Sequence, residues 1–190
     1  DLVSFRGPLG KAFNLPKHET QNTRRILLVG GGYGVVPLAY LAREAKKKGI
    51  ESIAVIGARK KDDVIYTDRF KAVGAHVEVT TDDGSLGTTG NAMHGVEKAF
   101  KKGQKFDAVY SCGPEKMMHA LAKICIEKNI YCELSIERYM KCGINICGAC
   151  ALDGKIICSD GPVFTAKEAL KFSEFGNTTR DASGKKCGMH

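Results

Sequence analysis

Residues 25–38 read RILLVGGGYGVVPL, and this stretch decides the fold. The apolar run from Ile26 to Val29 is typical of a strand that is buried on both faces, as in a parallel sheet. Four glycines then predict a tight turn, and the segment VPLAYLAREAKKKG predicts a helix that ends at Gly49. A strand, a glycine turn and a helix in this order predict the first unit of an α/β fold.

From residue 24 to 136, segments with strand character alternate with segments of helical period. This alternation predicts a five-stranded parallel sheet with helices on both faces. Ligands of such sheets bind at the carboxyl ends of the strands. The expected strands are residues 25–30, 52–58, 76–81, 106–113 and 130–135, and the expected helices are residues 36–49, 62–73 with Asp62 as N-cap, 91–103 and 114–129.

The glycine turn after the first strand is a candidate nucleotide site. Glycine lets a pyrophosphate approach the backbone, and the following helix offers free N–H groups and a favourable dipole. The pattern departs from GxGxxG because Pro37 stands where the third glycine belongs. The glycines alone are therefore also compatible with a tight turn that binds no ligand.

A second turn of small residues follows the fourth expected strand, at the same edge of the sheet. Cys112, Gly113 and Pro114 lead from this strand into a helix. Cys112 lacks a histidine close in sequence that could activate it as a nucleophile. We therefore expect Cys112 to pack in this turn or to line the site of the nucleotide's ring.

The loop TDDGSLGTTG also lies at this edge. Its residues Asp82 and Asp83 could act as a general base pair or as magnesium ligands, or the loop, with Gly84, could be a polar turn that caps the next helix. After the second strand, Arg59 and Lys60 leave NADP possible as the ligand, because arginine at this point can bind a 2′-phosphate. They are also ordinary surface residues of a turn between a strand and a helix.

Four cysteines, Cys142, Cys147, Cys150 and Cys158, crowd into 17 positions with small residues between them. The spacing is C-x4-C-x2-C followed by seven residues and the fourth cysteine, which is the pattern of plant-type [2Fe–2S] proteins. All four thiols must deprotonate and converge to hold iron. The sequence therefore predicts a [2Fe–2S] cluster on these four residues.

A structural zinc ion is the alternative for the same thiols. Zinc sites usually show two distant C-x2-4-C pairs, and this loop has one such pair, so the pattern favours iron. Cys125 and Cys132 fall in an expected helix and strand, where buried core thiols are typical. Cys187 has no assigned role.

The chain divides into three parts by pattern. Residues 1–23 read as a short strand and turn, LVSFRGPLGKAF, followed by a polar linker, NLPKHETQNT, and predict the end of a preceding domain. Residues 24–136 predict the nucleotide-binding domain. Residues 137–190 predict a small subdomain with the cysteine loop, a hairpin that turns at Asp153-Gly154 and a tail with one short helix.

The composition excludes several classes of protein. The 190 residues are 43% hydrophobic and 26% charged, and no apolar run reaches the ~18 residues of a membrane helix. The net charge is +8, but the lysines gather at the ends of helices and tryptophan is absent, so no nucleic-acid partner is expected. The first residues lack the features of a signal peptide, and a cytoplasmic location is expected.

With these motifs in hand, the chain resembles the family of electron-transfer subunits of NAD-dependent dihydroorotate dehydrogenase, within the ferredoxin reductase superfamily. The resemblance covers essentially the whole chain, and the cysteine loop followed by DGPVF is its most specific element. The segments that carry it are GPLGKAF (7–13), VGGGYGVVPL (29–38), TDDGSLG (81–87), CGPEKMM (112–118), the four cysteines with SDGPVF (159–164), and RDASGKK (180–186).

The resemblance implies a role in pyrimidine biosynthesis. Electrons pass from the flavin of a separate catalytic subunit through a [2Fe–2S] cluster and FAD to NAD, so the chain alone is not expected to oxidise dihydroorotate. It also implies an FMN-containing partner in a hetero-oligomer, and it makes residues 1–23 the remnant of an FAD-binding barrel that supplies most of the FAD site. Implied site residues are Gly31, Gly32, Gly34 and Pro37 at the pyrophosphate, Cys112, Gly113 and Pro114 at the nicotinamide, Asp83 and Gly84 in the same nucleotide site, and Cys142, Cys147, Cys150 and Cys158 as cluster ligands.

Two alternatives stay open. The gap of seven residues before Cys158 is shorter than in many members of the family, which leaves room for a related NAD(P)H:ferredoxin or sulfide-linked reductase subunit. The other alternative is a zinc-stabilised nucleotide-binding module with no redox role.

Overall fold

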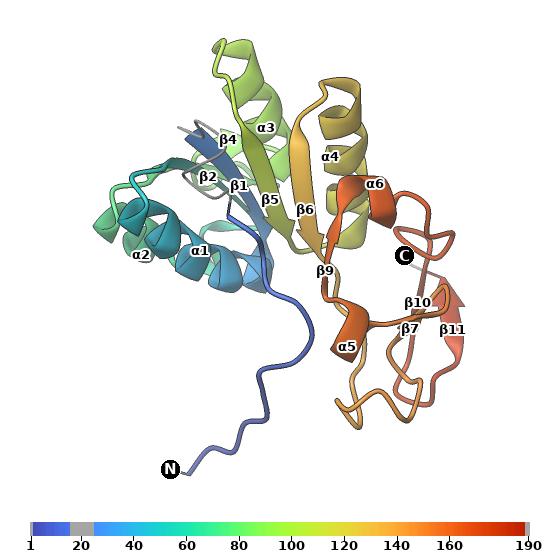
Figure 1. Cartoon of the computed structure of the whole chain (residues 1–190). Helices are drawn as coiled ribbons and strands as arrows, with labels where there is room; N and C mark the ends of the chain where they lie inside the picture. The colour runs from blue at the N-terminus through green and yellow to red at the C-terminus, as the bar shows by residue number, and fades with distance from the viewer. Residues whose placement is uncertain (1, 16–24, 189–190) are drawn as a thin grey trace.

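A computed structural model describes residues 2–15 and 25–188 of the chain. Seven strands form one sheet in the order β4-β3-β2-β1-β5-β6-β9 (Figure 1). Neighbouring strands are parallel except for β6 and β9, which are antiparallel. The strands are β1 (Arg25–Gly31), β2 (Glu51–Ala58), β3 (His76–Thr81), β4 (Thr88–Thr89), β5 (Ala108–Cys112), β6 (Tyr131–Ser135) and β9 (Val163–Thr165).

The five predicted parallel strands are confirmed, and the sheet extends beyond them on both sides. The strand β4 pairs Thr88 and Thr89 with the end of β3, inside a stretch that the sequence predicts as a loop. On the other side, β9 pairs antiparallel with β6 and closes that side of the sheet. Strands of two or three residues are too short to show an alternating apolar pattern in the sequence. They are recognised only by their pairing with β3 and β6 in the structure.

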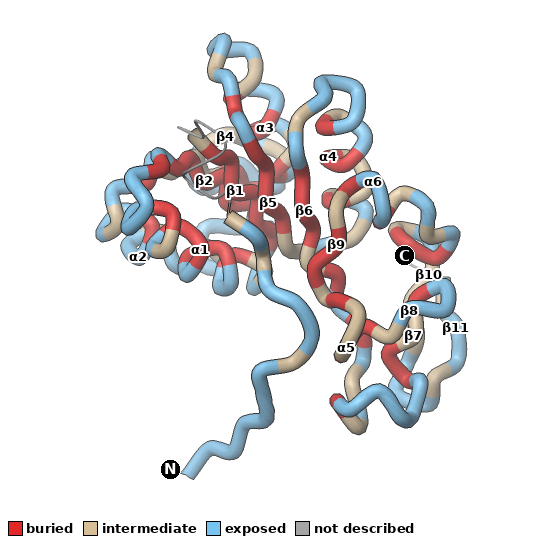
Figure 2. Tube along the Cα trace, in the orientation of Figure 1, coloured by how far each residue is buried: buried red, intermediate tan, exposed pale blue. Residues whose placement is uncertain are grey.

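Helices cover both faces of the sheet (Figure 1). On one face, α1 and α2 share a core cluster with Ile26, Leu28 and Tyr110 of the sheet; on the other face, α3, α4 and α6 share a cluster with Leu27 and Val29. Figure 2 shows that the central strands are buried along their length, as expected where both faces are covered. The helices are α1 (Val35–Lys47), α2 (Thr67–Ala72), α3 (Ala92–Lys101), α4 (Glu115–Glu127), α5 (Ile157–Asp160) and α6 (Ala166–Ala169).

The predicted helix over residues 62–73 is shorter than expected. A 3₁₀ turn forms at Lys61–Asp63, and α2 begins only at Thr67 after Tyr66 with φ of 67°. Asp62 is therefore not the N-cap, because Val64 and Ile65 lie outside any helix and Ile65 lines a cavity described below. None of the helices in the described part of the chain is long and apolar enough to cross a lipid bilayer.

The order of the strands reverses at β1, which positions the functional site. From β1 the chain proceeds outward through β2 and β3, then returns to place β5 on the opposite side of β1. The loops after β1 and β5 therefore leave the sheet side by side, with helices on opposite faces. Ligands of open α/β sheets bind at such a switch point.

The C-terminal part of the chain forms two small hairpins and two short helices. The hairpin of β7 (Ala151–Leu152) and β8 (Lys155–Ile156) turns at Asp153 and Gly154 with φ of 43° and 81°, as the sequence predicts. The predicted short helix is α6, which begins with a capping box between Thr165 and Glu168. The helix α5 and the hairpin of β10 (Thr178–Arg180) and β11 (Lys186–Gly188) were not expected.

The N-terminal residues 2–15 form no strand, so the predicted short strand is wrong. Residues 2–8 are exposed, and only the end of the segment lies against the sheet. There Asn14 N and Nδ2 donate to the buried Glu133 carboxylate at 2.8 and 3.0 Å, and Tyr110 Oη donates to Asn14 O at 2.8 Å. Lys11 makes an isolated bridge with Pro162. Most of the predicted linker, residues 16–23, lies outside the described residues.

Three basic side chains from two elements hold Glu78 on β3. Lys98 of α3 and Lys102, which caps the C-terminus of α3, donate to its carboxylate at 3.0 and 2.7 Å, and His76 Nε2 lies 3.3 Å from it. The hydrogen bonds from Lys102 and then Lys98 lower the pKa of Glu78 from 4.5 to about 2. The ionised carboxylate therefore ties α3 to the β3 side of the sheet.

We expect Glu78→Gln to lower the free energy of unfolding by about 1–2 kcal/mol at pH 7, since the lysines are partly exposed and the solvent screens the pair. Because the pKa of Glu78 is depressed in the folded protein, its contribution is complete above pH 4.5 and is lost as the pH falls to about 2. Urea unfolding at several pH values measures this difference. Glu97→Gln, in an exposed pair with Lys101, is the control and should change little. An equal effect of both variants at pH 7 would contradict this account of Glu78.

Candidate functional site

A cavity of about 740 Å³ opens at the carboxyl ends of β1, β2 and β3, on the face that α3 and α4 cover. The first turns of α3 and α4 form part of its wall, so their free N–H groups lie at its margin. Its size fits a dinucleotide fragment. Its lining residues are Gly31, Gly32, Tyr33, Gly57, Ala58, Arg59, Asp62, Asp63, Ile65, Asp82, Asn91, Ala92, Met93, Pro114, Lys116, Met117 and Ala120.

The two glycine turns touch each other at the base of this cavity. A Cβ atom on Gly31 would lie 2.6 Å from Pro114 Cδ, and one on Gly34 would lie 2.2 Å from the Cys112 carbonyl oxygen. Gly113 has φ of 145°, and its Cβ would lie 2.8 Å from Gly31 N. Only glycine allows these two backbones to come so close.

The predicted nucleotide residues of the two glycine turns therefore divide into three groups. Gly31, Gly32 and Pro114 line the cavity. Gly34, Cys112 and Gly113 are not in its lining but shape its base through the backbone contact, and Pro37 is exposed in the first turn of α1. That all seven hold a nucleotide stays a prediction.

The aspartates of the third loop also separate. Asp82 lines the cavity, whereas Asp83 accepts hydrogen bonds from Ser85 N at 2.9 Å and Ser85 Oγ at 2.6 Å. The Ser85 hydroxyl holds the pKa of Asp83 below its ordinary value. Gly84, with φ of 73°, completes the turn. The arrangement matches the polar-turn interpretation for Asp83, whereas Asp82 is the carboxylate of this loop that faces the cavity.

Several lining residues were not singled out by the sequence as site residues. Asp62 and Asp63 stand beside Arg59 on one wall, and Lys116 and Met117 come from the first turn of α4. Met117 lines the cavity and also packs against the core. These residues follow the ends of β2 and β5 by only a few positions, and this closeness to a strand end could have marked them in the sequence as site residues.

Cys112 points away from this cavity. Its half-buried side chain packs with the cluster of apolar residues under α1, opposite Ser135 on β6, and burial raises the pKa of its thiol. A neutral thiol suits a packing residue better than a nucleophile. A nicotinamide contact for Cys112 stays a prediction.

The cysteine loop brings its four thiols together as two pairs. The Cys147 side chain is a hydrogen-bonding neighbour of Cys142, and the Cys150 side chain is one of Cys158. Cys142 also acts on Cys158 electrostatically across the loop. Cys150 and Cys158 are 2% and 4% exposed, and Cys147 is exposed.

Backbone N–H groups point at the sulfur of Cys142, in the pair that it forms with Cys147. Ile146 N and Cys147 N both donate to Cys142 Sγ at 3.4 Å. Hydrogen bonds from Ile144 and these two residues lower the pKa of Cys142 to about 6. The loop can make this turn because Asn145 has φ of 58° and Gly143 and Gly148 both have φ of 67°. Burial instead raises the pKa of Cys158.

This donor set fits a binuclear iron–sulfur cluster, in which two thiolates hold each iron. The backbone N–H groups of Ile146 and Cys147, directed at Cys142 Sγ, also match the hydrogen bonds that tune such a cluster.

The remaining cysteines lie outside this loop. Cys125 on α4 and Cys132 on β6 are 0% and 3% exposed and lie against each other, which confirms the prediction of core thiols. Cys187 on β11 is half-buried, and its thiol lies 3.6 Å from the Lys185 carbonyl oxygen.

Comparison with protein families gives two matches on separate parts of the chain. Residues 28–123 match the family described as "Oxidoreductase NAD-binding domain". Residues 137–170 match the family described as "Iron-sulfur cluster binding domain of dihydroorotate dehydrogenase B". The first match contains the cavity, and the second contains the four paired thiols.

Curated relatives and solved structures extend these matches. The chain is 42% identical to the probable dihydroorotate dehydrogenase B (NAD(+)) electron transfer subunit of Methanocaldococcus jannaschii, over 98% of this chain and 70% of that protein. It is 41% identical to the corresponding subunit of Geobacillus kaustophilus, over 90% of this chain and 66% of that one. A solved NADH-dependent reduced ferredoxin-NADP oxidoreductase is 35% identical with a TM-score of 0.72, over 86% of this chain and 58% of that chain.

We expect Gly34→Ala to lower stability by at least about 2 kcal/mol and to abolish NAD binding, because its methyl group would push the two glycine turns apart. Gly32→Ala is the matched control for stability: its methyl meets nothing within 4 Å, so only the strain of its φ of 54°, about 1 kcal/mol, should lower the free energy of unfolding. Thermal unfolding and NAD titration measure the two effects. Equal stability of both variants would show that the contact with Cys112 is loose.

In protein freed of metal, iodoacetamide should alkylate Cys142 faster than Cys150 or Cys158 at pH 7, since the reaction needs an exposed thiolate. Because the pKa of Cys142 is depressed, its thiolate persists down to about pH 6 and is lost below that. Peptide mass spectrometry over pH 5–9 gives the rate at each thiol. A Cys142 rate that rises only above pH 8 would contradict the effect of the N–H donors.

Proposed function

Because the chain belongs to the family of electron-transfer subunits of dihydroorotate dehydrogenase B, we propose that it carries electrons from a flavin-containing catalytic subunit to NAD. On this proposal the partner is an FMN-containing subunit that oxidises dihydroorotate in pyrimidine biosynthesis, and the two chains form a hetero-oligomer. The chain alone does not oxidise dihydroorotate.

One observation carries the proposal: a single chain holds both the cavity at the switch point of the sheet and a loop with two pairs of thiols. The cavity supplies a nucleotide site and the loop supplies a cluster site. A binding module without redox chemistry needs no such loop. When bound, the cluster, FAD and the nicotinamide supply the redox chemistry of the complex.

The chain's own groups then have defined roles. Gly31, Gly32 and Pro114 admit the dinucleotide close to the backbone, and the first turns of α3 and α4 place their N–H groups beside its phosphates. Asp82 and Lys116 lie where they can orient its polar groups. Cys142, Cys147, Cys150 and Cys158 bind the iron, while backbone N–H groups stabilise the sulfur charge at Cys142.

Further parts of the proposal concern location and the upstream region. All eight cysteines are free thiols, and a reducing compartment such as the cytoplasm keeps them available for iron. We assign residues 24–136 to nucleotide binding and residues 137–190 to the cluster. We assign the FAD contacts of the family mainly to a barrel that precedes this region.

A related reductase subunit is the second candidate. The observation in its favour is the TM-score of 0.72 to the reduced ferredoxin-NADP oxidoreductase, at 35% identity. In that case the fold and the cluster remain, and the partner differs. Arg59 at the wall of the cavity would suit the 2′-phosphate of NADP, whereas Asp62 and Asp63 beside it would repel one.

The test is to purify the full-length protein anaerobically with its partner and to assay iron, sulfide and zinc. We expect about two irons and two sulfides per chain, a red-brown colour and an EPR signal in the reduced state. Cys147→Ser should lose the signal, and Cys187→Ser, outside the loop, should keep it. Dihydroorotate-dependent reduction of NAD should require both subunits.

Two outcomes would contradict the proposal. A colourless protein with one zinc per chain would show a module without redox activity. A normal cluster together with a partner that reduces ferredoxin, and no dihydroorotate activity in the complex, would establish the second candidate.

A further inference from the structure

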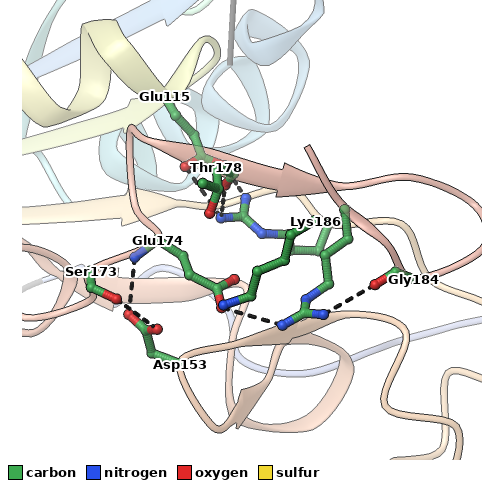
Figure 3. A network of polar contacts seen from close by, with 9 residues as sticks. Glu115, Asp153, Ser173, Glu174, Thr178, Gly184 and Lys186 are labelled. Atoms are coloured by element: carbon green, nitrogen blue, oxygen red, sulfur yellow. Dashed lines mark hydrogen bonds and ion pairs between the residues drawn. The ribbon is translucent and has the colours of Figure 1, made fainter. Parts of the chain in front are cut away.

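A network of charged side chains joins three parts of the chain that lie far apart in sequence. Figure 3 shows Glu115 and Thr178 close together, with Glu174, Lys186 and Asp153 nearby. Glu115 lies in the first turn of α4, Asp153 in the turn between β7 and β8, Glu174 in the segment between α6 and β10, and Thr178 and Lys186 in the hairpin of β10 and β11. The network therefore lies between the nucleotide cavity and the cysteine loop.

Its centre is the ion pair between Arg138 and Glu115, whose side chains are 0% and 7% exposed. Arg138 Nη1 contacts Glu115 Oε1, and Arg138 Nη2 donates to Glu115 Oε2 at 3.3 Å. Arg138 also donates to the carbonyl oxygens of Glu137 and Thr178, at 2.8 and 3.3 Å. Gly176 N donates to Glu115 Oε2 at 2.9 Å.

A second set of contacts continues from this pair to the hairpin of the cysteine region. Glu174, 5% exposed, accepts from Arg180 Nη2 at 3.2 Å and from Lys186 Nζ at 2.5 Å. Asp153, at the turn between Cys150 and Cys158, accepts from Ser173 Oγ at 3.0 Å and from Glu174 N at 3.1 Å. The network therefore contacts the cysteine region at two places: at Arg138, before the first cysteine, and at Asp153, in the hairpin between Cys150 and Cys158.

The positions of the central pair along the chain indicate what it holds. Glu115 directly follows Pro114 and precedes Lys116, both of which line the cavity. Arg138 lies four residues before Cys142 and ends the straight run out of β6. A shift of Arg138 relative to Glu115 would therefore move the cysteine loop relative to the nucleotide cavity.

Stability alone does not account for this pair. Apolar residues of similar volume are often as stabilising as a buried ion pair, because both charges lose their hydration. Arg138 Nε has no hydrogen-bond partner within the described residues, which makes the burial less favourable still. The pair instead offers a fixed geometry, since the guanidinium fork contacts both carboxylate oxygens.

We propose that Glu115 and Arg138 are positioning residues that fix the cysteine loop against the helix at the nucleotide cavity. This inference rests on the proposed function, because the role of the pair is to keep the cluster site and the nucleotide site at a fixed distance and orientation. Each residue acts through its partner and contacts neither thiol nor nucleotide in this role. The Arg138 charge also adds a fixed positive potential near the loop, which Glu115 balances.

The test compares Glu115→Gln and Arg138→Lys in the full-length protein. Arg138→Lys keeps the positive charge but loses the guanidinium group that contacts both carboxylate oxygens of Glu115. Glu115→Gln instead leaves the positive charge of Arg138 without its carboxylate partner. In both variants we expect the backbone amides of residues 139–150 to exchange hydrogen at least about tenfold faster, with α1 unchanged. In the complex with its partner, Glu115→Gln should also raise the reduction potential of the cluster, because the unbalanced positive charge favours the reduced state. Arg138→Lys should leave that potential nearly unchanged.

Glu51→Gln is the control, because it removes one charge from the exposed pair with Arg25 and should alter neither reading. Unchanged exchange of residues 139–150 in both variants would overturn the proposal, as would faster exchange spread evenly over α1 and β1. If Glu115→Gln does not fold, the exchange of Arg138→Lys decides. A wild-type protein without iron would contradict the proposed function, and the exchange measurement would still test the positioning role.

Discussion

The close approach of two backbone turns is the constraint on which the site depends. The chain leaves β1 at Gly31 and β5 at Cys112, and the two turns touch without side chains between them. A parallel sheet whose order reverses at β1 brings these two strand ends together. Since α1 and α4 then start on opposite faces, the cavity can open on the α4 side while Cys112 packs under α1.

The edge of the same sheet positions the cysteine region. The strand β6 leads directly to Arg138 and the cysteine loop, and β9 returns the chain antiparallel to β6 after the last cysteine. Ile136 N donates to Pro162 O at 2.9 Å, so both ends of the region meet next to the sheet. The loop can consequently have exposed residues such as Cys147 while its base is fixed, and this suits a group that must exchange electrons with a partner.

Charged residues on the surface and charged residues in the interior have different roles in this molecule. The net charge of +8 resides mainly on exposed lysines, which contribute little to stability individually. The few buried charged residues, among them Glu133, Arg138 and Glu174, each hold a separate segment against the body of the protein. Glu133 holds the N-terminal segment through Asn14, and the other two hold the C-terminal hairpin and the cysteine loop.

The sequence by itself determined the five parallel strands, the two glycine turns, the hairpin at Asp153-Gly154 and the spacing of the four cysteines, because each depends on local chemistry: buried apolar runs, positive φ and thiol reach. Only the tertiary structure decided which residues lie together around the nucleotide cavity. It separated Asp82 from Asp83, turned Cys112 away from the cavity and paired Glu115 with Arg138 across 23 positions of sequence. The sequence also did not predict the strands β4 and β9 or the start of α2 at Thr67. Such short elements form through contacts with residues far away in the sequence, and local sequence patterns do not show these contacts.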